Sequence, residues 1–139
     1  MIKPIELTIY GKPIAKKRPR FVRRGKFVGT YNDQETEEGR FILDAKSQLN
    51  GRDLIEGPIK LVTTFFMPIP KSTSKKKKAQ MMRGEIKHVK KPDVDNMLKF
   101  VCDCLNGIVW KDDSQVYIKH AAKIYSDNPM TKITVYEIS

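Results

Sequence analysis

The segment KPDVDNMLK, residues 91–99, determines how the C-terminal half of the chain is organised. Pro92 disfavours helical dihedrals at the residue before it, and Asp is a preferred N-cap, so we predict a helix that begins at Asp93 or Asp95. Its apolar residues fall on one arc at 100° per residue: Val94, Met97, Leu98, Val101, Cys104 and Leu105. Asp95 and Lys99 are neighbours on the edge of the polar side. The segment therefore places two carboxylates and an amine on a buried helix.

These acids also have a purely structural interpretation. The helix dipole favours acids in a first turn, and an Asp and a Lys four residues apart are common on solvated helix faces. Two interpretations are therefore open. Either these residues form a catalytic site, or the protein is a non-catalytic DNA-binding module whose Asp residues are only helix caps.

The composition indicates one globular domain over residues 1–139, with 40% hydrophobic residues to form a core. The sequence has no apolar run of about 18 residues and no signal-peptide pattern at its start, so we expect a soluble, cytoplasmic protein. Cys102 and Cys104 are the only cysteines, and a spacing of two suits neither a shared zinc site nor a disulfide. We interpret both as reduced packing residues.

The net charge of +11 is concentrated in two segments. Residues 12–28 carry eight Lys/Arg and no acid, and residues 71–91 carry nine Lys/Arg and one acid, which leaves a net −5 on the rest of the chain. Such segregation is typical of a protein that binds a phosphate backbone. A membrane-surface adaptor is the rival interpretation, but neither segment shows a sustained amphipathic helix with a bulky apolar face.

Alternation and turn residues predict an α+β fold: a mixed sheet of about four strands against two main helices, with basic loops. The predicted strands are residues 5–10, 58–67, 115–125 and 130–138, the last two as partners, and the predicted helices run from Asn32 or Asp33 to Leu49 and from the Asp93 region to Gly107. Ser74 is expected to cap a short helix that reaches Met82. His88 is interpreted as a phosphate contact at best, and His120 as a structural strand residue.

Residues 20–28 are predicted to form a short basic hairpin with its turn at residues 24–25. Phe21 and Phe27 then flank the turn, where aromatic rings among basic residues either stack on unpaired bases or anchor the hairpin to the body.

A second pair of acids, Asp112 and Asp113, lies on a tight turn after the predicted helix. Together with Asp93 and Asp95, they give three or four carboxylates that the helix is expected to bring towards one another. Carboxylates beside a phosphate-binding surface suit Mg²⁺, which prefers oxygen ligands and bridges Asp side chains to substrate phosphates. Such an ion can polarise a scissile phosphate. Lys99 is then placed to stabilise charge that develops on the phosphate or on the leaving oxygen, or to help orient the nucleophile.

The segments KPDVDNMLK (residues 91–99) and WKDDSQV (residues 110–116), separated by a helix, resemble those of the RusA-type crossover-junction endodeoxyribonucleases, also called Holliday junction resolvases. The resemblance is close over residues 90–118. It implies that Asp93, Asp95 and Asp113 are the essential acids and metal ligands, with Asp112 as the less certain member of its pair, and that Lys99 is the essential lysine. Where some relatives carry a basic residue before the first Asp, this chain has Pro92.

The resemblance further implies a small homodimeric, Mg²⁺-dependent enzyme of bacteria and their prophages. Such enzymes resolve four-way DNA junctions by paired symmetric nicks, in DNA recombination and repair. We expect the basic segments to contact the DNA through Lys16, Lys17, Arg18, Arg20, Phe21, Arg23, Arg24, Lys75, Lys76, Lys77, Lys78, Lys90 and Lys91. The resemblance also implies an aromatic residue near the N-terminal basic segment that helps to open the junction. Phe21 is our choice for that residue.

Overall fold

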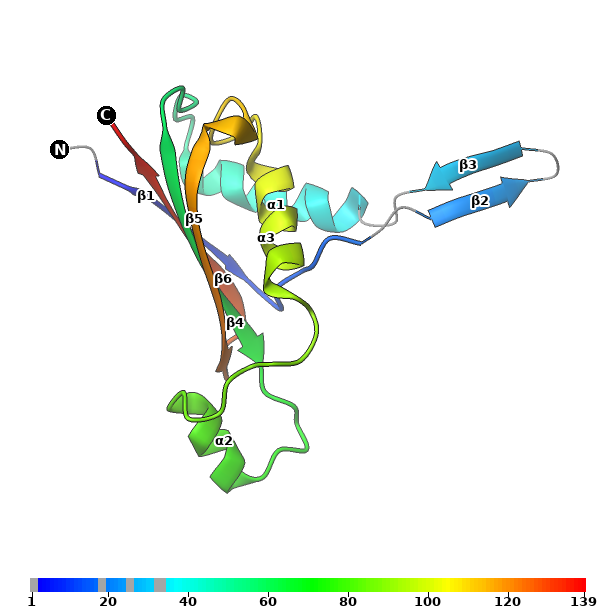
Figure 1. Ribbon diagram of the computed structural model, residues 1–139, viewed down its shortest axis with the longest axis vertical. Helices are drawn as coiled ribbons and strands as arrows, with labels where there is room; N and C mark the ends of the chain where they lie inside the picture. The colour runs from blue at the N-terminus through cyan, green and yellow to red at the C-terminus, as the bar shows by residue number, and fades with distance from the viewer. Residues whose placement is uncertain (1–2, 18–19, 25–26, 32–34) are drawn as a thin grey trace.

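The computed structural model describes residues 3–17, 20–24, 27–31 and 35–139 of the chain (Figure 1). Its centre is a four-stranded mixed sheet in the order β1-β6-β4-β5. The strands are β1 (Ile5–Tyr10), β4 (Ile59–Pro68), β5 (Val116–Ser126) and β6 (Met130–Glu137). β6 pairs antiparallel with both β1 and β4, whereas β4 and β5 are parallel. The predicted α+β class and mixed four-stranded sheet are confirmed.

Helices α1 (Glu35–Leu49) and α3 (Val94–Leu105) lie on one face of the sheet (Figure 1). The rings of Phe41 from α1 and Phe100 from α3 meet edge to face, with centroids 5.5 Å apart. β4 has strictly alternating burial and directs Leu61 and Phe65 into the core under these helices. A hydrophobic core thus forms between the sheet and its two main helices.

The predicted ends of the two main helices and the predicted start of α3 agree with the structure, while the start predicted for the first helix, at Asn32 or Asp33, lies outside the described residues. Asp93 is the N-cap residue of α3, which settles where that helix begins. Beyond its C-terminus, Gly107 has φ +78°, and beyond α1, Asn50 and Gly51 have φ values of 51° and 75°, the left-handed conformation that commonly ends helices. The buried arc of α3 is wider than predicted and also includes Phe100 and Cys102.

Both cysteines are free and buried, which confirms their interpretation as packing residues. Burial raises the pKa of the Cys102 thiol to about 11 and that of the Cys104 thiol to about 12. Both thiols are therefore protonated at neutral pH and poor nucleophiles. No helix in the described part of the chain is long and apolar enough to cross a membrane.

A third helix, α2 (Lys75–Met82), lies near the end of β4, away from the two main helices (Figure 1). Ser74 is its N-cap, and the Ser74 hydroxyl accepts a hydrogen bond of 3.3 Å from the backbone N–H of Lys77, as predicted. Strands β2 (Arg20–Arg24) and β3 (Phe27–Tyr31) form a separate antiparallel hairpin that projects from the body. The hairpin is confirmed, while residues 25–26 at its tip and the stacking role predicted for its aromatic side chains lie outside what the structure describes.

One predicted pairing is wrong. The last two strands, β5 and β6, are not partners, because β4 lies between them and pairs with both. β4 buries every second residue along its whole length, which suits a strand with neighbours on both sides. The short connection after Ser126 therefore crosses the end of β4 instead of forming a hairpin turn.

Candidate active site

The start of α3 holds the first pair of acids. Asp93 has the extended backbone of an N-cap residue (φ −69°, ψ 143°), and its carbonyl accepts the first helical hydrogen bond, 3.2 Å from the N–H of Met97. Its carboxylate nevertheless accepts no capping hydrogen bond from any described residue. The side chain of Asp93 is exposed and is not engaged as a helix cap.

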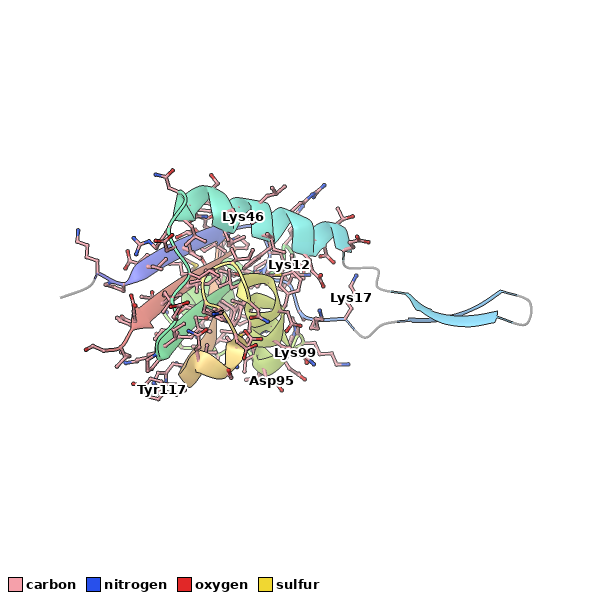
Figure 2. The ribbon with its side chains drawn as sticks, turned by 90° about the horizontal axis from the view of Figure 1, so that it is seen from above. Lys12, Lys17, Lys46, Asp95, Lys99 and Tyr117 are labelled. Carbon is pink, nitrogen blue, oxygen red and sulfur yellow. The ribbon has the colours of Figure 1, made fainter. Side chains whose placement is uncertain are left out.

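Asp95 and Lys99 follow one turn apart on α3, and both are exposed. Figure 2 shows them on the same side of the molecule, as their i, i+4 spacing predicts. Asp93, Asp95 and Lys99 therefore lie together at the N-terminal end of α3, facing solvent.

The second pair of acids lies at the opposite end of α3. Asp112 is the N-cap of a short 3₁₀ helix, η1 (Asp113–Gln115), and its carboxylate accepts a hydrogen bond of 2.9 Å from the N–H of Ser114. The Gln115 side chain accepts in return from the N–H of Asp112 at 2.7 Å, which completes a capping box. The hydrogen bond from Ser114 lowers the pKa of Asp112. Asp112 thus has a clear structural function.

Asp113 is held differently. Its Oδ1 accepts a hydrogen bond of 2.7 Å from the indole Nε1–H of Trp110, a residue that is fully buried. Trp110 is itself fixed by backbone contacts to the end of α3, where its carbonyl accepts from the N–H of Gly107 at 2.8 Å. One carboxylate oxygen of Asp113 is therefore oriented by the core, and the residue is only half-buried.

The structure does not bring all four carboxylates to one point. Asp95 is in the first turn of α3, whereas η1, which begins at Asp113, follows its last turn, so the whole of the helix beyond Asp95 lies between the two acid pairs along the chain. Within the described residues, no three His, Cys, Asp or Glu side chains are grouped to hold a metal ion. The acids form two pairs along one side of the molecule.

Two lysines that the sequence analysis missed lie between these pairs. Strand β5 runs back along α3, and Lys119 and Lys123 point to its helix-covered face, since their partners on β4 are the buried Leu61 and Phe65. Lys119 lies close enough to Cys102 that its charge acts to lower the pKa of that thiol, against the larger effect of burial. Because side chains alternate between the two faces of a strand, the spacing of four residues already predicts that Lys119 and Lys123 share one face of β5. The sequence does not show that this face is the one covered by α3.

The predicted DNA contacts differ in their surroundings. Those that the structure describes with exposed ammonium groups are Lys75, Lys76, Lys77 and Lys78 in the first turn of α2, and Lys90 and Lys91 before α3. The side-chain surroundings of Arg18, Arg20, Phe21, Arg23 and Arg24 lie outside the described part of the chain. Lys17 Nζ lies 3.7 Å from Glu37.

Lys16 is the predicted DNA contact with an evident structural role. Its Nζ lies 3.1 Å from Glu38 on α1 and 3.2 Å from Asp103 on α3. Burial acts to lower the pKa of Lys16, but the hydrogen bonds to these two carboxylates outweigh it and raise the pKa. This lysine fastens the N-terminal segment to both main helices.

His88 is not the exposed phosphate contact that we predicted. It is buried, and its ring lies against that of Tyr125 with centroids 4.8 Å apart. Burial is the main cause that lowers the pKa of His88, with smaller contributions from Lys123 and Lys90. A neutral, buried imidazole makes a packing contact rather than a phosphate contact.

Comparison with known proteins shows the family to which the chain belongs. Residues 10–136 match the family described as endodeoxyribonuclease RusA. The chain belongs to the RusA endodeoxyribonuclease family. The match extends from the end of β1 to β6 and includes both acid pairs, so it confirms the resemblance seen in the two sequence segments. RusA membership supports a nuclease activity on DNA.

The chain is also 36% identical, over 138 residues, to the uncharacterized protein YqaN of Bacillus subtilis (strain 168). The alignment covers 97% of each chain, so the two proteins are similar over nearly their whole lengths.

Proposed function

We propose that this protein is a Mg²⁺-dependent endonuclease that resolves four-way DNA junctions by paired symmetric nicks in DNA recombination and repair. The observation that carries the proposal is the state of Asp93. It occupies the N-cap position of α3, yet its carboxylate is not used for capping by the described residues, whereas Asp112 is fully engaged as a cap. The interpretation of the acids as helix caps therefore accounts for Asp112 and not for Asp93.

Asp93, Asp95 and Asp113 are proposed as the essential acids. Their carboxylates offer the hard oxygen donors that Mg²⁺ prefers, and Mg²⁺ is commonly held by one or two carboxylates together with waters and substrate phosphates. The exposed pair Asp93 and Asp95 fits that donor set, whereas Asp113, whose carboxylate is oriented by Trp110, belongs to the separate second pair and is proposed on the family resemblance. When bound, the ion supplies charge stabilisation at the scissile phosphate and a more acidic water.

Lys99 is proposed to stabilise negative charge that develops on the phosphate. It is exposed one turn from Asp95, and the described residues provide no ion pair within 4 Å to neutralise it. A cation that is fixed on a helix and not neutralised by the protein is suited to that role.

The lysines of α2 and the β2–β3 hairpin are proposed to grip the arms of the junction. Both elements project from the body of the domain, and α2 presents four exposed lysines in one helical turn (Figure 1). Their contribution is attraction to the phosphate backbone, which gives affinity without sequence information.

Two active sites are a geometric requirement of this function. A symmetric junction needs two symmetry-related cuts, and a C2 homodimer supplies one site for each. We therefore propose that the active form is a homodimer.

The test is cleavage of a synthetic four-way junction by the wild-type protein and by Asp95→Asn, at protein concentrations that give equal binding. Asp103→Asn is the matched control, because Asp103 lies on the same helix and pairs with Lys16 outside the proposed site. We expect Mg²⁺-dependent paired nicks from the wild-type and control proteins, and binding without cleavage from Asp95→Asn. If the wild-type protein binds the junction but leaves it intact with Mg²⁺, the non-catalytic module is the correct interpretation.

A further inference from the structure

Lys123 is bound to the backbone that leads into the proposed site. Its Nζ donates hydrogen bonds to two carbonyl oxygens, that of Lys90 at 2.5 Å and that of Pro92 at 3.0 Å. Pro92 is the residue immediately before Asp93. An ammonium group on the edge strand β5 therefore fastens the chain one residue before the N-cap of α3.

A second contact on the same strand holds the same segment. Tyr125 lies two residues beyond Lys123, on the same face of β5, and its ring packs against the buried His88. β5 thus fixes the segment of residues 88–92 at two points, through an aromatic contact at its start and two hydrogen bonds at its end.

The charges around this segment favour the arrangement. His88 faces two cations, Lys123 and Lys90, and its buried Nδ1 has no hydrogen-bond partner among the described residues. A neutral imidazole avoids repulsion of the Lys123 ammonium, which remains free to bind the two carbonyl groups. Hydrogen bonds from a charged donor are about twice as strong as neutral ones.

We propose that Lys123 is a positioning residue for the active site: it sets the place and direction in which Asp93 enters α3. This proposal rests on the proposed function, since it assumes that Asp93 acts in cleavage. Lys123 does not itself need to touch the DNA. Its ammonium is already committed to the carbonyl groups of Lys90 and Pro92, and only part of it is exposed.

Catalysis is sensitive to such positioning. A displacement of about 1 Å in a catalytic group can lower the rate on the order of 10²-fold. The carboxylate of Asp93 receives no capping hydrogen bond from the described residues, so it relies on the backbone before it for its location. The start of α3 has a second support, the hydrogen bond of 3.1 Å from the N–H of Lys16 to the carbonyl of Asn96. Loss of Lys123 should therefore loosen the segment without unfolding the helix.

The experiment compares Lys123→Met with Lys132→Met and Lys123→Arg. Lys132 is a matched control because it lies on β6, on the opposite face of the sheet, with its Nζ 5.6 Å from the centre of the Phe66 ring. Three quantities are measured for each protein: the single-turnover cleavage rate at saturating protein, the junction affinity, and the hydrogen-exchange rate of the Met97 amide, which bonds to the Asp93 carbonyl.

We expect Lys123→Met to cleave on the order of 10²-fold more slowly, with junction affinity equal to that of Lys132→Met and with faster exchange at Met97. Lys123→Arg should recover part of the rate, since a guanidinium also donates to two carbonyl groups. Two results would overturn the proposal: a cleavage rate equal to that of Lys132→Met, or a loss of rate matched by an equal loss of affinity, which would make Lys123 a DNA contact.

The exchange measurement separates this proposal from the proposed function. If the wild-type protein fails to cleave, the proposed function fails, and the Met97 amide alone shows whether Lys123 holds the segment. If Lys123→Met does not fold, the positioning role is tested with Lys123→Arg instead. Wild-type exchange with a cleavage rate that is partly or fully retained in Lys123→Arg supports the positioning role, and wild-type exchange with a rate reduced on the order of 10²-fold contradicts it.

Discussion

Replacement of Trp110 by Phe tests whether the buried core orients the acid of η1. The substitution keeps an aromatic ring in the core and removes the Nε1–H, which donates to Oδ1 of Asp113 at 2.7 Å. We expect Trp110→Phe to lower both the stability of the fold and the rate of junction cleavage, and to leave junction affinity unchanged.

The expected size follows from two contributions. A hydrogen bond to a charged group contributes about 1.5–3 kcal/mol, and the lower end applies because Asp113 is partly exposed. Trp110 is fully buried, and truncation of a buried Trp to Ala costs about 3–5 kcal/mol, so the smaller change to Phe should cost about 1–2 kcal/mol. Together they amount to about 3 kcal/mol, which corresponds to a fall in Tm of roughly 10 °C for a domain of this size.

A double-mutant cycle in urea separates these contributions. It uses Trp110→Phe, Asp113→Ala and the double variant, and the free energy of unfolding is measured for each. In the Asp113→Ala background the hydrogen bond is already absent, so Trp110→Phe lowers the free energy of unfolding only through lost packing. That background therefore serves as the control for the packing contribution. We expect a coupling energy of about 1.5 kcal/mol between the two side chains.

The cleavage assay completes the test. With one carboxylate oxygen of Asp113 no longer fixed, the single-turnover rate of Trp110→Phe should fall between about 10- and 100-fold at saturating protein. A coupling energy below about 0.5 kcal/mol, the level at which independent sites add, would refute the reasoning that Trp110 orients this acid.

Three further predictions concern the acids, the basic helix and the buried histidine. Asp113→Asn should abolish cleavage while Asp112→Asn retains most of it, because Asn is also a good N-cap; gel-shift and cleavage assays would show the error if the order were reversed. Replacement of all four residues 75–78 by Gln should make the plot of log affinity against log salt shallower by up to about 3–4, and an unchanged slope would exclude phosphate contacts there. The pKa of His88 is lower in the folded protein than its unfolded value of about 6.5, so the free energy of unfolding should fall as pH decreases below that value. Urea denaturation from pH 7 to pH 5 should show a weaker dependence in His88→Phe, and equal slopes would contradict the assignment.

Much of the fold was predictable because its signals are local. The β-branched and aromatic residues of β4, the Ser74 cap of α2 and the Asn50-Gly51 end of α1 are each signals of a few consecutive residues. The pairing of β5 was not predictable in this way. A short connection after a strand favours a hairpin, and only the whole sheet shows that β4 takes the position between β5 and β6.

The same distinction holds for the candidate site. Asp93, Asp95 and Lys99 lie together because their spacing on one helix requires it. The sequence did not fully decide between Asp112 and Asp113 as the essential acid of their turn. It does contain a capping-box signal, Asp112 followed three residues later by Gln115, which predicts a structural role for Asp112. The expected gathering of all four acids required knowledge of the path that the chain follows after α3. That path places η1, which begins at Asp113, after the last turn of the helix.

Helix α2 shows how charge and local structure act against each other in this protein. Its first turn consists of four lysines, where the positive end of the helix dipole disfavours cations by about 0.3–1 kcal/mol each at low ionic strength. The Ser74 cap offsets about 1 kcal/mol of that cost, and α2 contributes no buried residue to the core. A polyanion bound at this turn removes the repulsion and also satisfies the free N–H groups of the first turn. The lysines thus make the helix less stable when it is free, and the phosphate contacts proposed for them would offset that cost.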